Sequence, residues 1–124
     1  MSHLRIAALV ALLLVPALDE IAIGQALSVR SVGAVTWHAN KFIGKTVKLK
    51  GFVLSLSHGE VLFSDEGTGA ISPHDLPIQG PGSETLELHH RYLLVGIFVK
   101  DDALHSNGSP YHLLLTAQPT PADG

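Results

Sequence analysis

The chain has no cysteine among its 124 residues. Disulfide bonds, thiol catalysis, iron–sulfur ligation and cysteine-based zinc sites are therefore excluded. Aromatic residues are also scarce, with one Trp, two Tyr and four Phe, and only 15% of residues are charged. The formal net charge of −3 indicates neither a strongly basic nucleic-acid-binding chain nor an acidic tail. We therefore expect a small globular domain that is stabilised by its apolar core alone.

The longest apolar run lies at the N-terminus. Residues 6–18 are apolar except for Pro16, they follow Arg5, and Gly24-Gln25-Ala26 comes after them. This order is typical of a secretory signal, and a helix of this length spans about 20 Å, short of the roughly 30 Å membrane core. We predict that residues 1–26 are a signal peptide cleaved after Ala26, so that the protein is periplasmic or secreted. The alternative is a retained N-terminal anchor, and only then would the protein contact a membrane.

The remaining chain is long enough for one domain. Removing 26 of 124 residues leaves 98, and it lowers the eight Lys/Arg and eleven Asp/Glu to seven and nine, a net charge of −2. We predict one domain over residues 27–118 and a disordered tail over residues 119–124.

Hydrophobic periodicity predicts one short helix followed by strands. Val32, Val35, Ala39 and Phe42 recur at helical spacing over residues 31–43, with Ser31 as the N-cap and Gly44 as the end. The five expected strands span residues 46–56, 60–64, 70–72, 92–99 and 111–117, with a Pro- and Gly-rich loop over residues 73–83. The apolar face of the first strand switches at Gly51, which predicts a bend. We predict an all-β fold with one short helix, a five-stranded OB-type Greek-key barrel.

Four segments carry a resemblance to a known family. They are residues 42–53 (FIGKTVKLKGFV), 62–65 (LFSD), 68–71 (TGAI) and 95–100 (VGIFVK). Together they resemble the bacterial OB-fold (BOF) family of small periplasmic proteins. The resemblance implies an OB-type barrel and an exported binding or stress-associated protein of the cell envelope without known catalysis.

The predicted binding face lies on the first three strands and the turn at Asp65. The candidate ligand-binding residues are Lys45, Lys48, Lys50, Phe52, Asp65 and Thr68. The partner would be an unidentified small ligand or an envelope protein, and the alternative is a single-stranded oligonucleotide on the lysines. The lysines could also simply be the solvated edge of a strand, and Asp65 could cap the turn near Gly67.

Seven histidines follow Ala26, and they suggest a metal or haem carrier as a further alternative. The candidate ligands are His89, His90 and His105, although no His-x-His or His-x-x-x-His spacing is present, so scattered surface histidines are the competing interpretation. Asp101 and Asp102 could join Asp65 and Glu66 in an acidic pocket for a cation. We predict no cofactor and no catalytic residue, because the chain has no Gly-x-Ser-x-Gly elbow and no recognisable carboxylate pair.

Overall fold

The structure, a computed structural model, describes residues 27–56 and 59–122. The predicted signal peptide and His58 lie outside these residues. The helical segments are α2 (Val32–Thr36), η1 (Ala39–Lys41) and η3 (Ser83–Thr85). The strands are β1 (Val29–Ser31), β2 (Thr46–Ser55), β3 (Val61–Ser64), β4 (Leu76–Gln79), β5 (Arg91–Lys100), β6 (Tyr111–Leu115) and β7 (Thr120–Pro121). No helix in the described ranges is long and apolar enough to cross a membrane.

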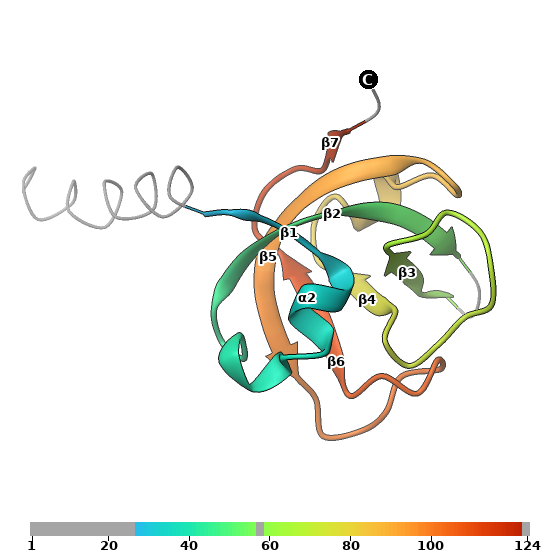
Figure 1. Ribbon diagram of the computed structural model, residues 1–124. Helices are drawn as coiled ribbons and strands as arrows, with labels where there is room; N and C mark the ends of the chain where they lie inside the picture. The colour runs from blue at the N-terminus through green and yellow to red at the C-terminus, as the bar shows by residue number, and fades with distance from the viewer. Residues whose placement is uncertain (1–26, 57–58, 123–124) are drawn as a thin grey trace, which may run out of the picture.

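Five of these strands close into a barrel (Figure 1). The strand order is β2-β3-β4-β6-β5, and pairing of β2 with β5 completes the circle. Only the β4–β6 pair is parallel, and the other four pairs of the barrel are antiparallel. The predicted five-stranded OB-type barrel with one short helix is confirmed.

The two terminal strands extend the barrel without joining its circle. β1 pairs with residues 48–50 of β2, on the edge that β3 uses from Phe52 onward. β7 pairs with Tyr92 and Leu93 of β5, on the edge that β6 uses from Gly96 onward. The prediction that residues 119–124 form a disordered tail is therefore wrong at Thr120 and Pro121. Residues 123 and 124 lie outside the described part.

The helix predicted over residues 31–43 is found as α2 and η1, separated by a turn. Ser31 is the N-cap as predicted, because its Oγ accepts a 3.0 Å hydrogen bond from the Ala34 N–H. The sequence VGAVT of α2 contains Gly and β-branched residues, which are weak helix formers, so the helix is short. Val32, Val35 and Ala39 nevertheless join the barrel core, which also contains Phe63, Phe98, Leu49, Leu94 and Leu113.

Two predictions about the strands are wrong. The apolar face of β2 does not switch at Gly51, because Val47, Leu49, Gly51 and Val53 are all buried, and the register shift falls between Val53 and Ser55. Gly51 instead permits close packing, since a Cβ there would lie 2.6 Å from the Ser64 carbonyl oxygen.

The third barrel strand is β4 and not residues 70–72. β4 lies inside the segment predicted to be a loop. Pro77 in its second position favoured the loop prediction, because proline has no N–H to donate within a sheet. Leu76, Pro77 and Ile78 are all buried, and Pro77 lies opposite Leu62 of β3. The free energy gained by burying these three consecutive apolar residues exceeds the cost of the one backbone hydrogen bond that proline cannot donate.

Candidate metal centre

The loop between β5 and β6, residues 101–110, is held in a defined shape by its own backbone. The Asp101 N–H donates to the Pro110 carbonyl at 2.8 Å, and the His105 N–H donates to the Ser109 carbonyl at 2.8 Å. Gly108 has a φ of 91°, and its N–H donates to the His105 carbonyl at 2.8 Å. Residues with side chains rarely adopt this backbone conformation, so Gly108 lets the turn close.

Asn107 fastens the same loop to the segment that precedes β4. Its Nδ2 donates to the carbonyls of Ser72 and Asp75 at 2.9 and 2.8 Å. Its Oδ1 accepts from the Ser109 N–H at 3.3 Å. The side chains at both ends of the loop therefore start from fixed backbone positions.

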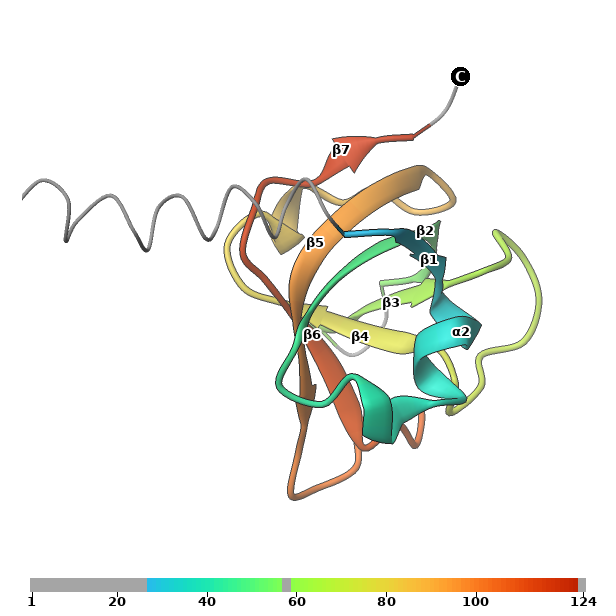
Figure 2. The same cartoon turned by 60° about the vertical axis from the view of Figure 1, so that its left-hand side comes forward.

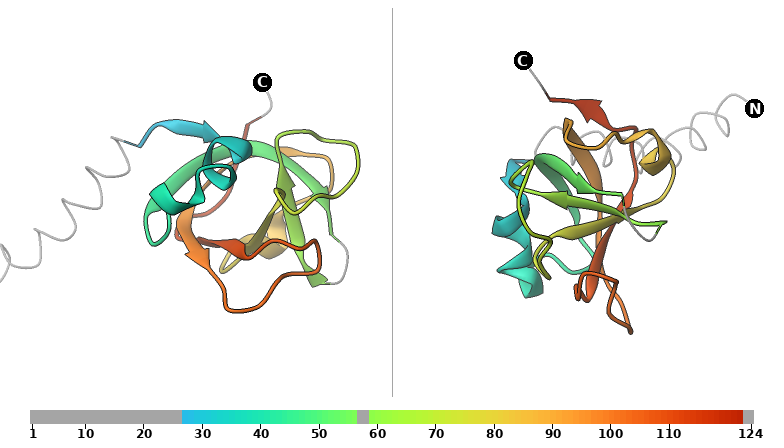
Figure 3. Two further views of the ribbon diagram at one scale, coloured as in Figure 1. Left: turned by 60° about the horizontal axis from the view of Figure 1, so that its bottom comes forward. Right: turned by 90° about the vertical axis from the view of Figure 1, so that its right-hand side faces the viewer.

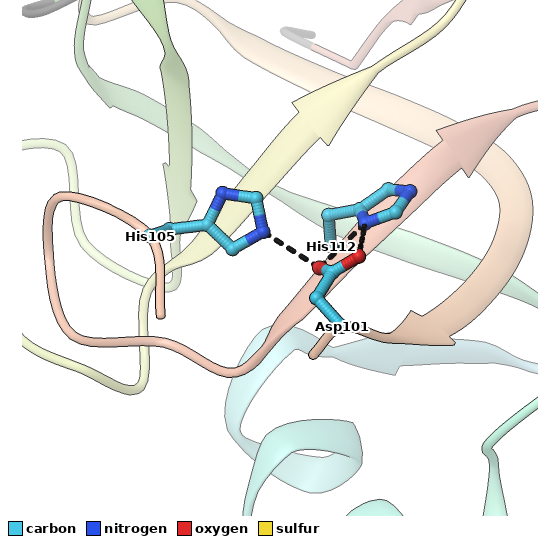
Figure 4. A group of neighbouring side chains, drawn as sticks. All are labelled: Asp101, His105 and His112. Atoms are coloured by element: carbon cyan, nitrogen blue, oxygen red, sulfur yellow. Dashed lines mark hydrogen bonds and ion pairs between the residues drawn. The ribbon is translucent and has the colours of Figure 1, made fainter. Parts of the chain in front are cut away.

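Three side chains from this loop and β6 meet at one point (Figure 4). The His105 Nε2 lies 2.6 Å from Asp101 Oδ2, and the His112 Nδ1 lies 2.8 Å from the same oxygen and 3.0 Å from Asp101 Oδ1. We call Asp101, His105 and His112 the histidine cluster. One potential ligand atom from each of the three lies within 4.8 Å of the others.

Glu60, just before β3, completes the surroundings of His105. Its Oε2 lies 2.5 Å from His105 Nδ1, and its Oε1 accepts from the Ser106 hydroxyl at 2.8 Å. Each ring nitrogen of His105 therefore faces a carboxylate. A carboxylate on the outer nitrogen of a histidine fixes the ring and makes the other nitrogen a better metal ligand.

The cluster is partly shielded from water. The exposed fractions of the side chains are 12% for His105, 10% for His112 and 25% for Asp101. Burial alone would lower the pKa of His105, but the hydrogen bonds and charges of Asp101 and Glu60 raise it above its ordinary value. Burial alone would raise the pKa of Asp101 and Glu60, but their contacts with histidines, and with Ser106 for Glu60, lower both values.

The stability of the metal-free protein is expected to be greatest between about pH 4.5 and 6.5. The contribution of His105 is complete below its ordinary pKa of 6.5 and is lost as the pH rises through the raised value. The contributions of Glu60 and Asp101 are complete above their ordinary values of 4.5 and 3.8 and are lost as the pH falls through the lowered ones. Urea denaturation in EDTA from pH 4 to 9 measures this profile.

The matched variant for this profile is His105→Gln, because glutamine keeps a polar side chain that does not titrate. It is expected to remove most of the decline above pH 6.5. A decline that persists unchanged in this variant would show that His105 is not the group responsible for it.

The position of the cluster matches the binding region of OB barrels. Such barrels bind ligands with the loops between their first and second and between their fourth and fifth strands. Here Glu60 comes from the first of these loops and His105 from the second, and the hydrogen bond between them joins the two. The loop with His105 projects from the end of the barrel away from β7 (Figure 3).

Of the three histidines that the sequence singled out as metal ligands, the structure places only one in the histidine cluster. His105 belongs to the histidine cluster, whereas His89 Nδ1 contacts the Gly67 carbonyl at 2.8 Å and His90 Nε2 lies 3.8 Å from Glu87. Sequence reasoning missed His112 as a ligand. The spacing of Asp101 and His105, four residues apart in a turn-rich loop, was the available signal.

The predicted ligand-binding residues are divided between two regions of the surface. Lys50, Phe52 and Asp65 line one groove with Arg30 and Arg91. Thr68 lines a second pocket that also contains Trp37 and His74, whose rings stack at 3.7 Å, and Asp65 lines both. Lys45 and Lys48 line neither of these two.

Asp65 binds the start of α2 and not the turn around Gly67. Its Oδ1 accepts from the Val32 N–H at 2.7 Å and its Oδ2 accepts from the Gly33 N–H at 2.9 Å. A carboxylate at this position satisfies two N–H groups that have no partner within the helix.

Replacing Asp65 by alanine is therefore expected to destabilise the fold by about 1–2 kcal/mol, measured by urea denaturation. Asp102→Ala is the matched control, because Asp102 is an exposed acid with no helix to cap, and it should change stability by less than about 0.5 kcal/mol. Equal effects of the two variants would show that the two bonds to α2 contribute nothing.

The sequence matches no protein-family model and no curated protein. Its structure is similar to that of a DUF3299 family protein from Pseudomonas aeruginosa PAO1. The two share 16% sequence identity with a TM-score of 0.47, over 68% of this chain and 65% of that chain. This chain thus spans less than two thirds of the length of that protein. The similarity concerns the small β-barrel.

Proposed function

We propose that this protein is a non-enzymatic binding protein of the bacterial cell envelope that holds one divalent transition-metal ion at the histidine cluster. The observation that carries the proposal is the convergence of His105, His112 and Asp101, with ligand atoms within 4.8 Å of one another. Each comes from a backbone position fixed by the strand pairing or by the loop hydrogen bonds described above.

The chemistry of the donors selects the class of ion. Two imidazoles and one carboxylate suit zinc, copper, nickel or iron, whereas magnesium and calcium prefer sites made of oxygen alone. Sulfur ligands are excluded because the chain has no cysteine and its one methionine is Met1. Affinity is expected to follow the usual order for such donors, with Cu²⁺ bound more tightly than Ni²⁺ or Zn²⁺.

Three protein ligands leave a coordination position open in a tetrahedral site. Glu60 would stay on the outer nitrogen of His105 and keep that ring oriented. An open position suits an ion that is taken up and passed on, because an incoming ligand can bind before a protein ligand leaves.

Export and family membership belong to the same proposal. Export is supported by the charged, apolar and small-residue order of residues 1–26, and membership of the bacterial OB-fold family is supported by the strand order of the barrel. Intact mass of the chain purified from a periplasmic extract tests export, with cleavage after Ala26 as the expected result. A full-length chain in the cytoplasmic fraction would overturn it.

Equilibrium dialysis of the EDTA-treated protein against Zn²⁺, Cu²⁺, Ni²⁺ and Mg²⁺ tests metal binding. We expect one transition-metal ion per chain and no Mg²⁺. The double variant His89→Ala/His90→Ala is the control, because it removes two histidines outside the cluster and should bind the same amount. Absence of binding at about 100 µM metal, or its loss in the control, would overturn the proposal.

A further inference from the structure

A second site of different chemistry lies on the side of the barrel where β1 runs along β2 (Figure 2). It is a groove of about 470 Å³, within the range of small-molecule sites. Arg30 of β1, Lys50 and Phe52 of β2 and Arg91 of β5 line it. We call these four residues the basic groove. None of them belongs to the histidine cluster.

The three cations of the basic groove have no acidic partner. Among the residues that the structure describes, every ion pair involves a histidine, so Arg30, Lys50 and Arg91 form none. The single acid in the lining is Asp65, and both of its oxygens are bound by N–H groups of α2. The groove therefore carries three positive charges against the one negative charge of Asp65, a net charge of +2.

Aromatic rings hold the two guanidinium groups. The Arg91 Cζ lies 5.4 Å from the centre of the Phe52 ring, and the Arg30 Cζ lies 5.0 Å from the centre of the Phe42 ring. Stacking on a ring occupies the face of a guanidinium and leaves the N–H groups at its edge available to oxygen ligands.

Arg91 also has an unused donor. Its Nε is buried and has no hydrogen-bond partner within the described ranges. A buried donor without a partner is costly in free energy, so an oxygen ligand that reached this N–H would be bound favourably.

We infer that the basic groove binds a phosphate group carried on a small organic molecule. Two arginines and a lysine match the charge of a phosphate monoester, and the planar fork of arginine matches the spacing of phosphate oxygens. Phe52 would lie beside the organic part. An oligonucleotide is the alternative occupant, but a groove of this volume and three cations fit one phosphate better than a chain of them.

The test uses phenyl phosphate, inorganic phosphate, phenol and a ten-residue oligothymidine with the EDTA-treated protein. Amide NMR titration should show saturable shifts near Arg30, Lys50 and Gly51 with both phosphates and none with phenol. Absence of saturation by about 10 mM phenyl phosphate would overturn the inference. So would oligothymidine binding without phenyl phosphate binding, which would assign the groove to nucleic acid.

Arg30→Gln and Lys50→Gln each remove one groove cation from an exposed position, and each should weaken phenyl phosphate binding about tenfold. Lys100→Gln is the matched control, because it removes one exposed charge at the other end of β5. Equal weakening in the control would show that only net charge matters and would overturn the site. His105→Ala should leave phosphate binding unchanged, so the result is independent of the metal site.

Discussion

Replacing His105 by alanine is expected to weaken Zn²⁺ binding by at least about 100-fold. The substitution removes one of three protein ligands and also releases Glu60, whose carboxylate contacts the other ring nitrogen. Asp101→Asn should cause a similar loss, because an amide oxygen is a much poorer ligand than a carboxylate that approaches both histidines. Competition with a chromophoric chelator measures both affinities.

His90→Ala is the matched single variant for this experiment, because His90 is an exposed histidine outside the histidine cluster that lies beside Glu87 and Tyr92. It should bind Zn²⁺ within roughly twofold of the unmodified chain. Circular dichroism separates loss of the ligand from loss of the fold. A folded His105→Ala chain that keeps its affinity would place the metal elsewhere.

The substitution Gly96→Ala is expected to destabilise the protein by about 3 kcal/mol or more. A Cβ at this position of β5 would lie 2.4 Å from the Leu114 carbonyl oxygen and 2.9 Å from the Leu113 side chain. Relief would require β5 and β6 to separate where Gly96 pairs with Leu115. Because the barrel is closed, a shift of one strand strains both of its neighbours.

Gly44→Ala distinguishes this clash from the loss of glycine itself. Gly44 has a φ of 79° and open space where a Cβ would lie, so its cost should be backbone strain of about 1 kcal/mol. Urea denaturation compares the two variants. A smaller effect at Gly96 than at Gly44 would contradict the close approach of β5 and β6.

The barrel could be predicted because its long strands carry their own signal. β2 and β5 are each ten residues long and alternate between buried and more exposed positions over most of their length. β4, β1 and β7 were not predicted, because they have four, three and two residues and two of them contain proline. Each of these strands is held by pairing with strands that are distant in sequence, and sequence periodicity does not report such pairing.

The candidate site was predictable by residue type but not by arrangement. His105 was singled out as a histidine, and Asp101 as part of an acidic loop. His112 lies in β6, inside the strand predicted over residues 111–117, and its place there gave no sign of a ligand. The cluster depends on strand pairing that sets Lys100 opposite Tyr111, which brings the two ends of the loop together. The two paired residues are eleven positions apart in the sequence, so a pattern of neighbouring residues does not predict their contact.

The terminal strands also limit self-association of this protein, because they cover edges of the two longest strands. β1 occupies the backbone N–H and C=O groups of residues 48–50 of β2, and β7 does the same for Tyr92 and Leu93 of β5. Without them, the two longest strands would each present an open edge to other chains. A chain that lacks the residues up to and including Ser31 would expose the edge of β2 at residues 48–50, and we expect it to form dimers by strand exchange.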